Sequence, residues 1–291
     1  MNRKTAIVTD TNSGITVQEA SRLGITLIQM PVMIDQISYN ESSITPDFFF
    51  EAQGREDSKI ITSQPSAGEL IRIFSELAET FEDIVYIPMS SALSSACQTA
   101  KMLCSEYRLP VYTADNRRIS VTQKQSVLDA LRMAEAGMHA QEICSMLEAH
   151  ADDNGIYIMV DSLHTLSRTG RITPAASALG SLLKVHPILK IMGGKLDAFS
   201  ICRSVRKAKH ILLETLKNDL EQLEDHVHII LHTAWSGMDE EFTAEWEKEV
   251  SEAFPEYPIA SDPLPFSICA HTGPGCFGIG WSRQWHPDSN A

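Results

Sequence analysis

Short apolar runs alternate with amphipathic helical patterns through the first half of this chain of 291 residues. The apolar runs cover residues 5–9, 25–34, 84–89 and 111–114, and each ends in polar turn residues. Runs of this length without polar alternation are typical of parallel strands that are buried on both faces. The helical patterns cover residues 66–81, 126–136 and 140–150. This order predicts a parallel sheet with helices packed on it.

The order of elements changes after about residue 152. The second half contains strand-like runs at 156–160, 187–192, 195–202, 227–231 and 277–281, and helical patterns at 174–183, 204–223 and 239–254. Gly193 and Gly194 separate two of these runs and indicate a hairpin. We therefore predict an α/β fold of two domains. The first, 1–152, holds the parallel sheet, and the second, 153–291, is a mixed α/β domain.

Composition excludes some classes of function. Hydrophobic residues make up 43% of the chain, and the formal net charge is -14. This acidity argues against nucleic-acid binding, which needs clustered Lys and Arg. The run at 5–9 is too short for a signal peptide, and no apolar run approaches the length of a membrane span. The six cysteines form no C-x-x-C pair, as expected of buried thiols in a reducing compartment. We expect a cytoplasmic protein without integral membrane association.

Two hydroxyl-rich segments and one histidine segment carry the strongest chemical signal. Thr62 and Ser63 follow the apolar pair 60–61, and Ser94 and Ser95 follow the run 84–89. Each segment precedes a helix, where free N–H groups and the helix dipole favour an anion. If both junctions belong to one parallel sheet, their ends converge at a crevice. The alternative is that these side chains only cap helices or stabilise turns.

His271 stands beside Thr272, Gly273, a proline and a second glycine, which allow the backbone to turn close to a ligand. A neutral imidazole there could donate to a carboxylate, and a protonated one could balance its charge. The alternative is an ordinary buried histidine.

Other chemistries find little support. A G-x-S-x-G segment and a partnered His–Asp set are both missing, which argues against a hydrolase. His226, His228 and His232 would share one face of a strand, but no acid or cysteine motif accompanies them. We expect no metal and no cofactor.

Six short motifs occur in order along nearly the whole chain and together resemble the DegV family of fatty-acid-binding proteins. They lie at 10–11, 62–66, 166–172, 186–189, 193–203 and 271–275. In that family such proteins present a bound lipid to a separate ATP-dependent fatty acid kinase, which feeds phospholipid metabolism. The resemblance implies a two-domain fold with the ligand between the domains and with part of the early chain joining the second domain.

The resemblance also implies roles for individual residues. Thr62 and Ser94 match the hydroxyls that bind the fatty acid carboxylate, and Ser63 and Ser95 adjoin them. His271, Thr272 and Gly273 match the family's last motif. Arg171 and Arg203 lie beside matching residues and would meet the phosphate or the kinase, although either could instead form a structural salt bridge. The protein itself would not be an enzyme, because the chain has no P-loop or kinase signature.

Some positions depart from the family pattern. Ser95 and Ala96 replace a Gly-Thr pair, and Thr122 and Lys124 replace the glycines of a Gly-x-Gly segment. These changes lie in loops near the expected carboxylate. A second hypothesis is therefore a binding or regulatory module that takes another amphiphile and has no kinase partner.

Overall fold

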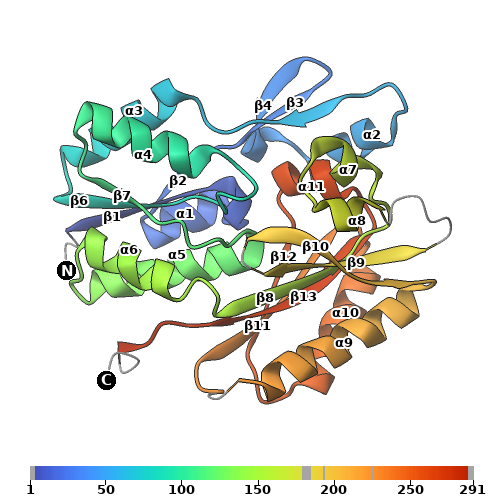
Figure 1. Cartoon of the computed structure of the whole chain (residues 1–291). Coiled ribbons are helices and arrows are strands. Elements are labelled where there is room, and N and C mark those ends of the chain that lie inside the picture. Colours follow the sequence, from blue (N-terminus) through green and yellow to red (C-terminus); the bar gives the residue numbers. More distant parts are fainter. Residues whose placement is uncertain (1–3, 179–184, 193, 224–225, 288–291) are drawn as a thin grey trace.

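The predicted parallel sheet is present, with strand order β2-β1-β6-β7 (Figure 1). The computed structural model describes residues 4–178, 185–192, 194–223 and 226–287. All neighbouring strands in this sheet are parallel. The strands are β1 (Thr5–Asp10), β2 (Thr26–Ile28), β6 (Asp83–Ile87) and β7 (Val111–Thr113). All six residues of β1 are buried, which explains why its sequence shows an apolar run rather than alternation.

Helices cover both faces of the parallel sheet. Side chains of α3 and α4 form one core with Val8 and Tyr86, and side chains of α5 and α6 form another with Ile7 and Val85. The helices of this region are α1 (Val17–Leu23), α3 (Ala67–Ala78), α4 (Ala96–Tyr107), α5 (Ser120–Glu135) and α6 (Ala140–Ala149). Alternate residues of one strand thus face opposite helical layers.

A mixed sheet forms the second large layer, with strand order β10-β9-β8-β13-β11-β12. Only β11 and β12 are parallel in it. Its strands are β8 (Asn154–Met159), β9 (His186–Met192), β10 (Lys195–Cys202), β11 (Ile229–Ser236), β12 (Ile259–Pro263) and β13 (Cys276–Arg283). Tyr157 and Met159 pack with α9 (Val205–Glu221) and α10 (Glu240–Ala253).

The opposite face of the mixed sheet packs against short helices and against early parts of the chain. Ile156 and Ile158 share a core with Leu166, Phe49 and Val32. The helices on this side are α2 (Pro46–Gly54), α7 (His164–Thr169), α8 (Pro174–Ala178) and α11 (Phe266–Thr272). Residues far apart in the sequence therefore share one core, while the division of the chain at residue 152 stays a prediction.

A third, three-stranded sheet corrects one prediction. The run at 25–34 is not one strand, because β3 (Pro31–Ile34) leaves the parallel sheet and pairs antiparallel with β4 (Ile37–Asn40) and β5 (Ile60–Thr62). Thr62 pairs with Val32 at the end of β5. The prediction that both hydroxyl-bearing junctions belong to one parallel sheet is wrong, because β5, which Thr62 ends, belongs to the separate sheet β4-β3-β5.

Two further boundaries differ from the predictions. Helix α5 begins at Ser120, whereas the sequence predicted a start at 126. The prediction missed the first turns because Thr122 and Gln123 are polar but buried, so they break the apolar pattern expected of a buried helix face. β11 begins at Ile229, so His226 and His228 precede the strand and do not share a strand face with His232. The predicted helix at 174–183 is described only over α8, and its remainder lies outside the described residues.

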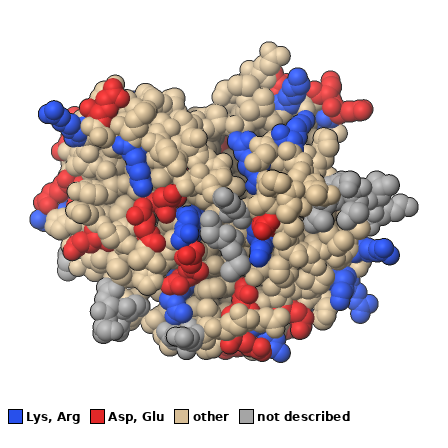
Figure 2. All heavy atoms as spheres, in the orientation of Figure 1, with Lys and Arg blue, Asp and Glu red and all other residues tan. Residues whose placement is uncertain are grey.

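Acidic and basic side chains are interspersed on the face shown in Figure 2, which carries no continuous basic strip. No helix in the described ranges has both the length and the apolar character needed to cross a bilayer.

The predicted hairpin at 187–202 is confirmed by the antiparallel pairing of β9 and β10. Gly194 at its tip reaches the end of the parallel sheet, where Ser90 Oγ donates to the Gly194 carbonyl at 3.0 Å. Gly194 has φ +84°, and a β-carbon there would overlap Ser90 Oγ and lie 3.0 Å from Arg117 Cβ. The close approach therefore requires glycine.

We expect Gly194→Ala to lower the free energy of unfolding by about 1–3 kcal/mol. The added methyl group overlaps Ser90 Oγ, and a residue with a β-carbon is strained at the positive φ of this position. Urea unfolding followed by circular dichroism measures this. Gly68→Ala is the matched control, since Gly68 lies in helix α3 with no atom within 4 Å of the added carbon. Equal stabilities of Gly194→Ala and wild type would contradict the hairpin contact.

Candidate functional site

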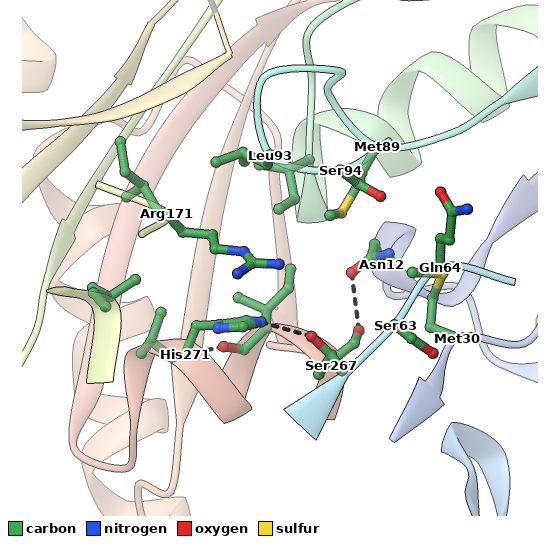
Figure 3. Close-up of a pocket in the computed structure, with 16 residues that line it drawn as sticks. Asn12, Met30, Ser63, Gln64, Met89, Leu93, Ser94, Arg171, Ser267 and His271 are labelled. Carbon is green, nitrogen blue, oxygen red and sulfur yellow. Dashed lines mark hydrogen bonds between the residues drawn. The ribbon is translucent and has the colours of Figure 1, made fainter. Parts of the chain in front are cut away.

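A cavity of about 70 Å³ lies where the segments after β1, β5 and β6 meet α11 (Figure 3). Six of the nine residues predicted from the sequence line it: Thr62, Ser63, Ser94, Arg171, His271 and Thr272. The remaining polar lining comes from Asn12, Gln64 and Ser267, and the apolar lining includes Met30, Met89 and Leu93. The structure thus brings together three segments that are separate in the sequence, and Thr62 and His271 lie 209 residues apart.

The other three predicted residues lie outside the lining. Ser95 is exposed and is the N-cap residue of α4, but its side chain makes no capping hydrogen bond. Gly273 ends α11, and its carbonyl accepts from Ser236 Oγ at 2.8 Å. Arg203 follows β10 and is exposed. Their proposed contacts with a ligand or a partner would have to be made outside this cavity.

Two hydrogen bonds hold the His271 ring between Thr62 and Thr169. Thr62 Oγ1 lies 2.8 Å from His271 Nε2, and Thr169 Oγ1 lies 3.1 Å from His271 Nδ1. The Thr169 hydroxyl donates its own hydrogen to the Thr165 carbonyl at 2.9 Å, so it accepts from a protonated Nδ1. In the neutral ring Nε2 then carries no hydrogen and accepts the hydrogen of Thr62.

Burial, with a smaller contribution from the Arg171 guanidinium, lowers the pKa of His271 from 6.5 to about 4. Both causes disfavour the protonated ring. His271 is therefore neutral near pH 7, and the cationic group of the cavity is Arg171. An anion bound beside His271 would act in the opposite direction and raise its pKa.

Arg171 directs positive charge into the cavity (Figure 3). One guanidinium nitrogen donates to the Thr169 carbonyl, which anchors the side chain to the end of α7. No ion pair joins Arg171 to a carboxylate within the described part of the chain. Its remaining donors are suited to planar or tetrahedral oxyanions.

Ser94 stands just before α4, where its Oγ accepts from the backbone N–H of Ala96 at 3.2 Å. The hydroxyl hydrogen remains available to a ligand, because the oxygen serves the helix as an acceptor. This local bond is the capping alternative considered from the sequence, and it is compatible with a role in the cavity.

Asn12 is a cavity residue that sequence reasoning missed. Its side chain is 1% exposed, and its Oδ1 accepts from Ser267 Oγ at 2.9 Å (Figure 3). Its Nδ2 makes no hydrogen bond of normal geometry among the described residues, although it lies near enough to the Asp10 carboxylate to lower the pKa of that group. A buried donor without a hydrogen bond of normal geometry is unfavourable, so a ligand oxygen that accepted from Nδ2 would remove that penalty. The position of Asn12 two residues after the motif residue Asp10 is its only sequence signal.

A second cavity of about 50 Å³ adjoins the first and is almost entirely apolar. Ile119, Leu196, Ile268 and Thr272 line both cavities. The second is bounded by the sheet residues Ile156, Ile158, Ile191, Ala234 and Ile279. A cavity that holds Arg171 and several hydroxyl groups thus adjoins an almost entirely apolar one inside the molecule.

The histidines considered for metal binding are engaged in other contacts. His226 Nδ1 lies 3.0 Å from the Tyr257 hydroxyl, His228 stacks on His286, and His232 Nε2 lies 2.9 Å from Ser282 Oγ. Within the described ranges no group of three or more His, Cys, Asp or Glu side chains is arranged to hold a metal ion.

Comparisons with known proteins agree on one family. The family model described as an uncharacterised protein of the DegV family matches residues 4–284. A DegV domain-containing protein of Listeria innocua is 29% identical, over 97% of this chain and 99% of its own.

Two solved structures are similar in fold and in sequence. One is described as a fatty-acid-binding DegV family protein from Thermus thermophilus, with a TM-score of 0.87, 27% identity, and coverage of 96% of this chain and 99% of that one. The other is described as DegV, a fatty acid binding protein from Bacillus subtilis, with a TM-score of 0.86, 26% identity, and coverage of 97% and 100%. The family model covers nearly the whole chain, and this chain therefore belongs to the DegV family.

Proposed function

We propose that this protein binds a long-chain fatty acid and presents its carboxylate to a separate ATP-dependent kinase. The observation that carries the proposal is that the cavity lined by Thr62, Ser94 and Arg171 adjoins the apolar cavity against the mixed sheet and shares lining residues with it. A fatty acid has the same division into an anionic head and an apolar tail. The two DegV structures described as fatty acid binding support this ligand class.

The tail supplies most of the affinity. Burial of about sixteen methylenes at roughly 0.8 kcal/mol each is worth on the order of 13 kcal/mol before the losses of ligand and side-chain freedom. The apolar cavity, at about 50 Å³, is smaller than a long acyl chain, so its side chains must move apart to admit one. The tail therefore accounts for binding, and the head-group cavity accounts for orientation.

The carboxylate head group would compete with His271 Nε2 for the hydroxyl hydrogen of Thr62. Without ligand this hydrogen is donated to His271 Nε2, so a carboxylate that accepts it leaves the imidazole nitrogen without a partner. The carboxylate can remove that conflict by raising the pKa of His271 until Nε2 takes up a proton. Ser94, Asn12 and Arg171 supply further donors. We also propose Ser63 and Thr272 as part of this site, since both line the cavity.

The protein is proposed to be a non-catalytic subunit. The chain has no glycine-rich nucleotide loop with its lysine, so ATP must be bound by the partner. Phosphoryl transfer to the carboxylate would give an acyl phosphate, whose added charge Arg171 is suited to hold. Because the kinase needs ATP, we propose that this protein and the kinase meet in the cytoplasm.

Native mass spectrometry of the purified full-length protein tests the ligand class. We expect a co-purifying fatty acid of about fourteen to eighteen carbons, because such a tail supplies roughly 0.8 kcal/mol for each buried methylene. A co-purifying amphiphile without a carboxylate would favour the second hypothesis, a module for another ligand. Protein that neither carries nor takes up a fatty acid would contradict the proposal.

The double variant Thr62→Ala, Ser94→Ala should weaken fatty acid binding by about 1–3 kcal/mol, as for hydrogen bonds to a charged group. Titration calorimetry with delipidated protein measures the loss. Ser95→Ala is the matched control, because the exposed Ser95 side chain lies outside the cavity. Unchanged affinity in the double variant would remove Thr62 and Ser94 from the site.

Arg171→Ala should reduce acyl phosphate formation with the kinase about tenfold or more, since a hydrogen bond to a charged group is worth about 1.5–3 kcal/mol. Its effect on lipid affinity should be smaller, because the tail supplies most of that affinity. Labelled ATP and Mg²⁺ without kinase should give no acyl phosphate.

Arg203→Ala tests the second predicted arginine, which is exposed and lies outside the cavity. Loss of turnover in Arg203→Ala with unchanged lipid affinity would support its predicted contact with the kinase. Equal losses of lipid binding and turnover in Arg171→Ala would indicate a structural role. Label that enters the lipid without a kinase would overturn the non-catalytic assignment.

A further inference from the structure

A cleft of about 850 Å³ lies apart from the two cavities described above. It is bounded by the start of α1, by the segment from Glu41 into α2, and by the carboxyl ends of β11 and β12. None of the residues that line it also lines the head-group cavity or, apart from Leu264, the apolar cavity. The proposed function leaves this cleft unassigned, although its volume suits a small molecule.

Aromatic rings from three elements line the cleft. Phe50 of α2 and Phe266 of α11 meet edge to face, with centroids 6.4 Å apart and an interplanar angle of 70°. Trp235 from the end of β11 adds a third ring. Phe49, which does not line the cleft, packs against both phenyl rings. Ring faces carry partial negative charge, so any ring face left open to the cleft attracts a cation.

The ionisable residues that line the cleft are all acidic. Glu41 is 6% exposed and accepts hydrogen bonds from the Thr11 hydroxyl and from the backbone N–H of Ser267, and it lies within reach of the Ser267 hydroxyl, whose one hydrogen Asn12 Oδ1 can also accept. No cationic side chain pairs with it within the described part of the chain. Asp47 lies in the exposed first turn of α2. No Lys, Arg or His side chain belongs to the lining found among the described residues.

We propose that this cleft binds a small organic cation, an ammonium ion that carries methyl or other apolar groups. The aromatic rings would contact the apolar groups and attract the charge, and Glu41 and Asp47 would balance it. A neutral apolar molecule would gain only the ring contacts, and an anion would be repelled by both carboxylates. The cleft therefore selects by charge, and this inference is independent of the proposed fatty acid function.

Titration calorimetry of the full-length protein with choline tests the inference, with 3,3-dimethylbutan-1-ol as the neutral probe of the same shape. We expect saturable binding of one choline per chain. The neutral alcohol should bind at least about tenfold more weakly, because it lacks the attraction between the cation and the rings. Equal binding of the two probes, or no binding of choline at millimolar concentration, would overturn the proposal.

Two variants locate the binding to the cleft. Asp47→Asn should weaken choline binding about two- to fivefold, as for loss of a solvent-exposed charge pair. Phe50→Leu should reduce the preference for choline over the alcohol, because it keeps an apolar side chain but removes the ring. Glu51→Gln is the matched control, since Glu51 is an exposed acid on the same helix outside the cleft.

The Glu51→Gln variant separates binding of choline in the cleft from a general attraction of choline to an acidic protein. If Glu51→Gln weakens choline binding as much as Asp47→Asn does, the effect belongs to the overall negative charge and the proposal fails. Thermal melting of each variant identifies any that does not fold, and Asp47→Asn alone decides the matter if Phe50→Leu is unstable. Choline binding and fatty acid binding are measured separately, so either can fail without the other.

Discussion

The buried carboxylate of Asp10 joins the segments from which the head-group cavity is built. It stands at the end of β1, is fully buried, and accepts from Gln123 Nε2 at 3.0 Å and from the backbone N–H groups of Met89 and Asn12, each at 3.2 Å. These donors belong to α5, to the segment after β6 and to the turn after β1. Burial raises the pKa of Asp10 to about 6, so the hydrogen bonds only partly compensate for lost hydration. The places of Asn12 and of the loop that carries Ser94 both depend on this carboxylate.

The hydrogen bond between Asp10 and Gln123 also shows which parts of the fold the sequence could predict and which it could not. The apolar runs of β1 and β6 predict buried parallel strands, and both are present in the parallel sheet. The first turns of α5 were not predicted, because the polar side chain of Gln123 is buried through hydrogen bonds to distant residues, among them Asp10, which lies 113 residues earlier. Apolar periodicity carries no information about such a pair. The split of the run at 25–34 was missed for a similar reason, since β3 is defined by its partners β4 and β5 rather than by its own pattern.

Sequence reasoning predicted part of the candidate site by local chemistry. Hydroxyls after apolar runs led to Thr62 and Ser94, and a glycine-framed segment led to His271; all three line one cavity. Asn12 and Ser267 were missed because they are linked by a hydrogen bond that spans 255 residues of sequence. Arg171 and Arg203 could not be told apart by motif alone. Arg171 follows a helix that ends at the cavity, whereas Arg203 follows a strand and points to solvent.

Ser267 stands between the head-group cavity and the acidic cleft. Its single hydroxyl hydrogen has two acceptors within reach, Asn12 Oδ1 at 2.9 Å and the Glu41 carboxylate at 3.0 Å. Burial raises the pKa of Glu41, so the charge on this carboxylate responds to its surroundings. An ionised Glu41 is a stronger acceptor than an amide oxygen and competes with Asn12 for this hydrogen. The hydroxyl can serve only one acceptor at a time, so the hydrogen bonding of Asn12 in the head-group cavity and of Glu41 at the cleft depends on one shared group.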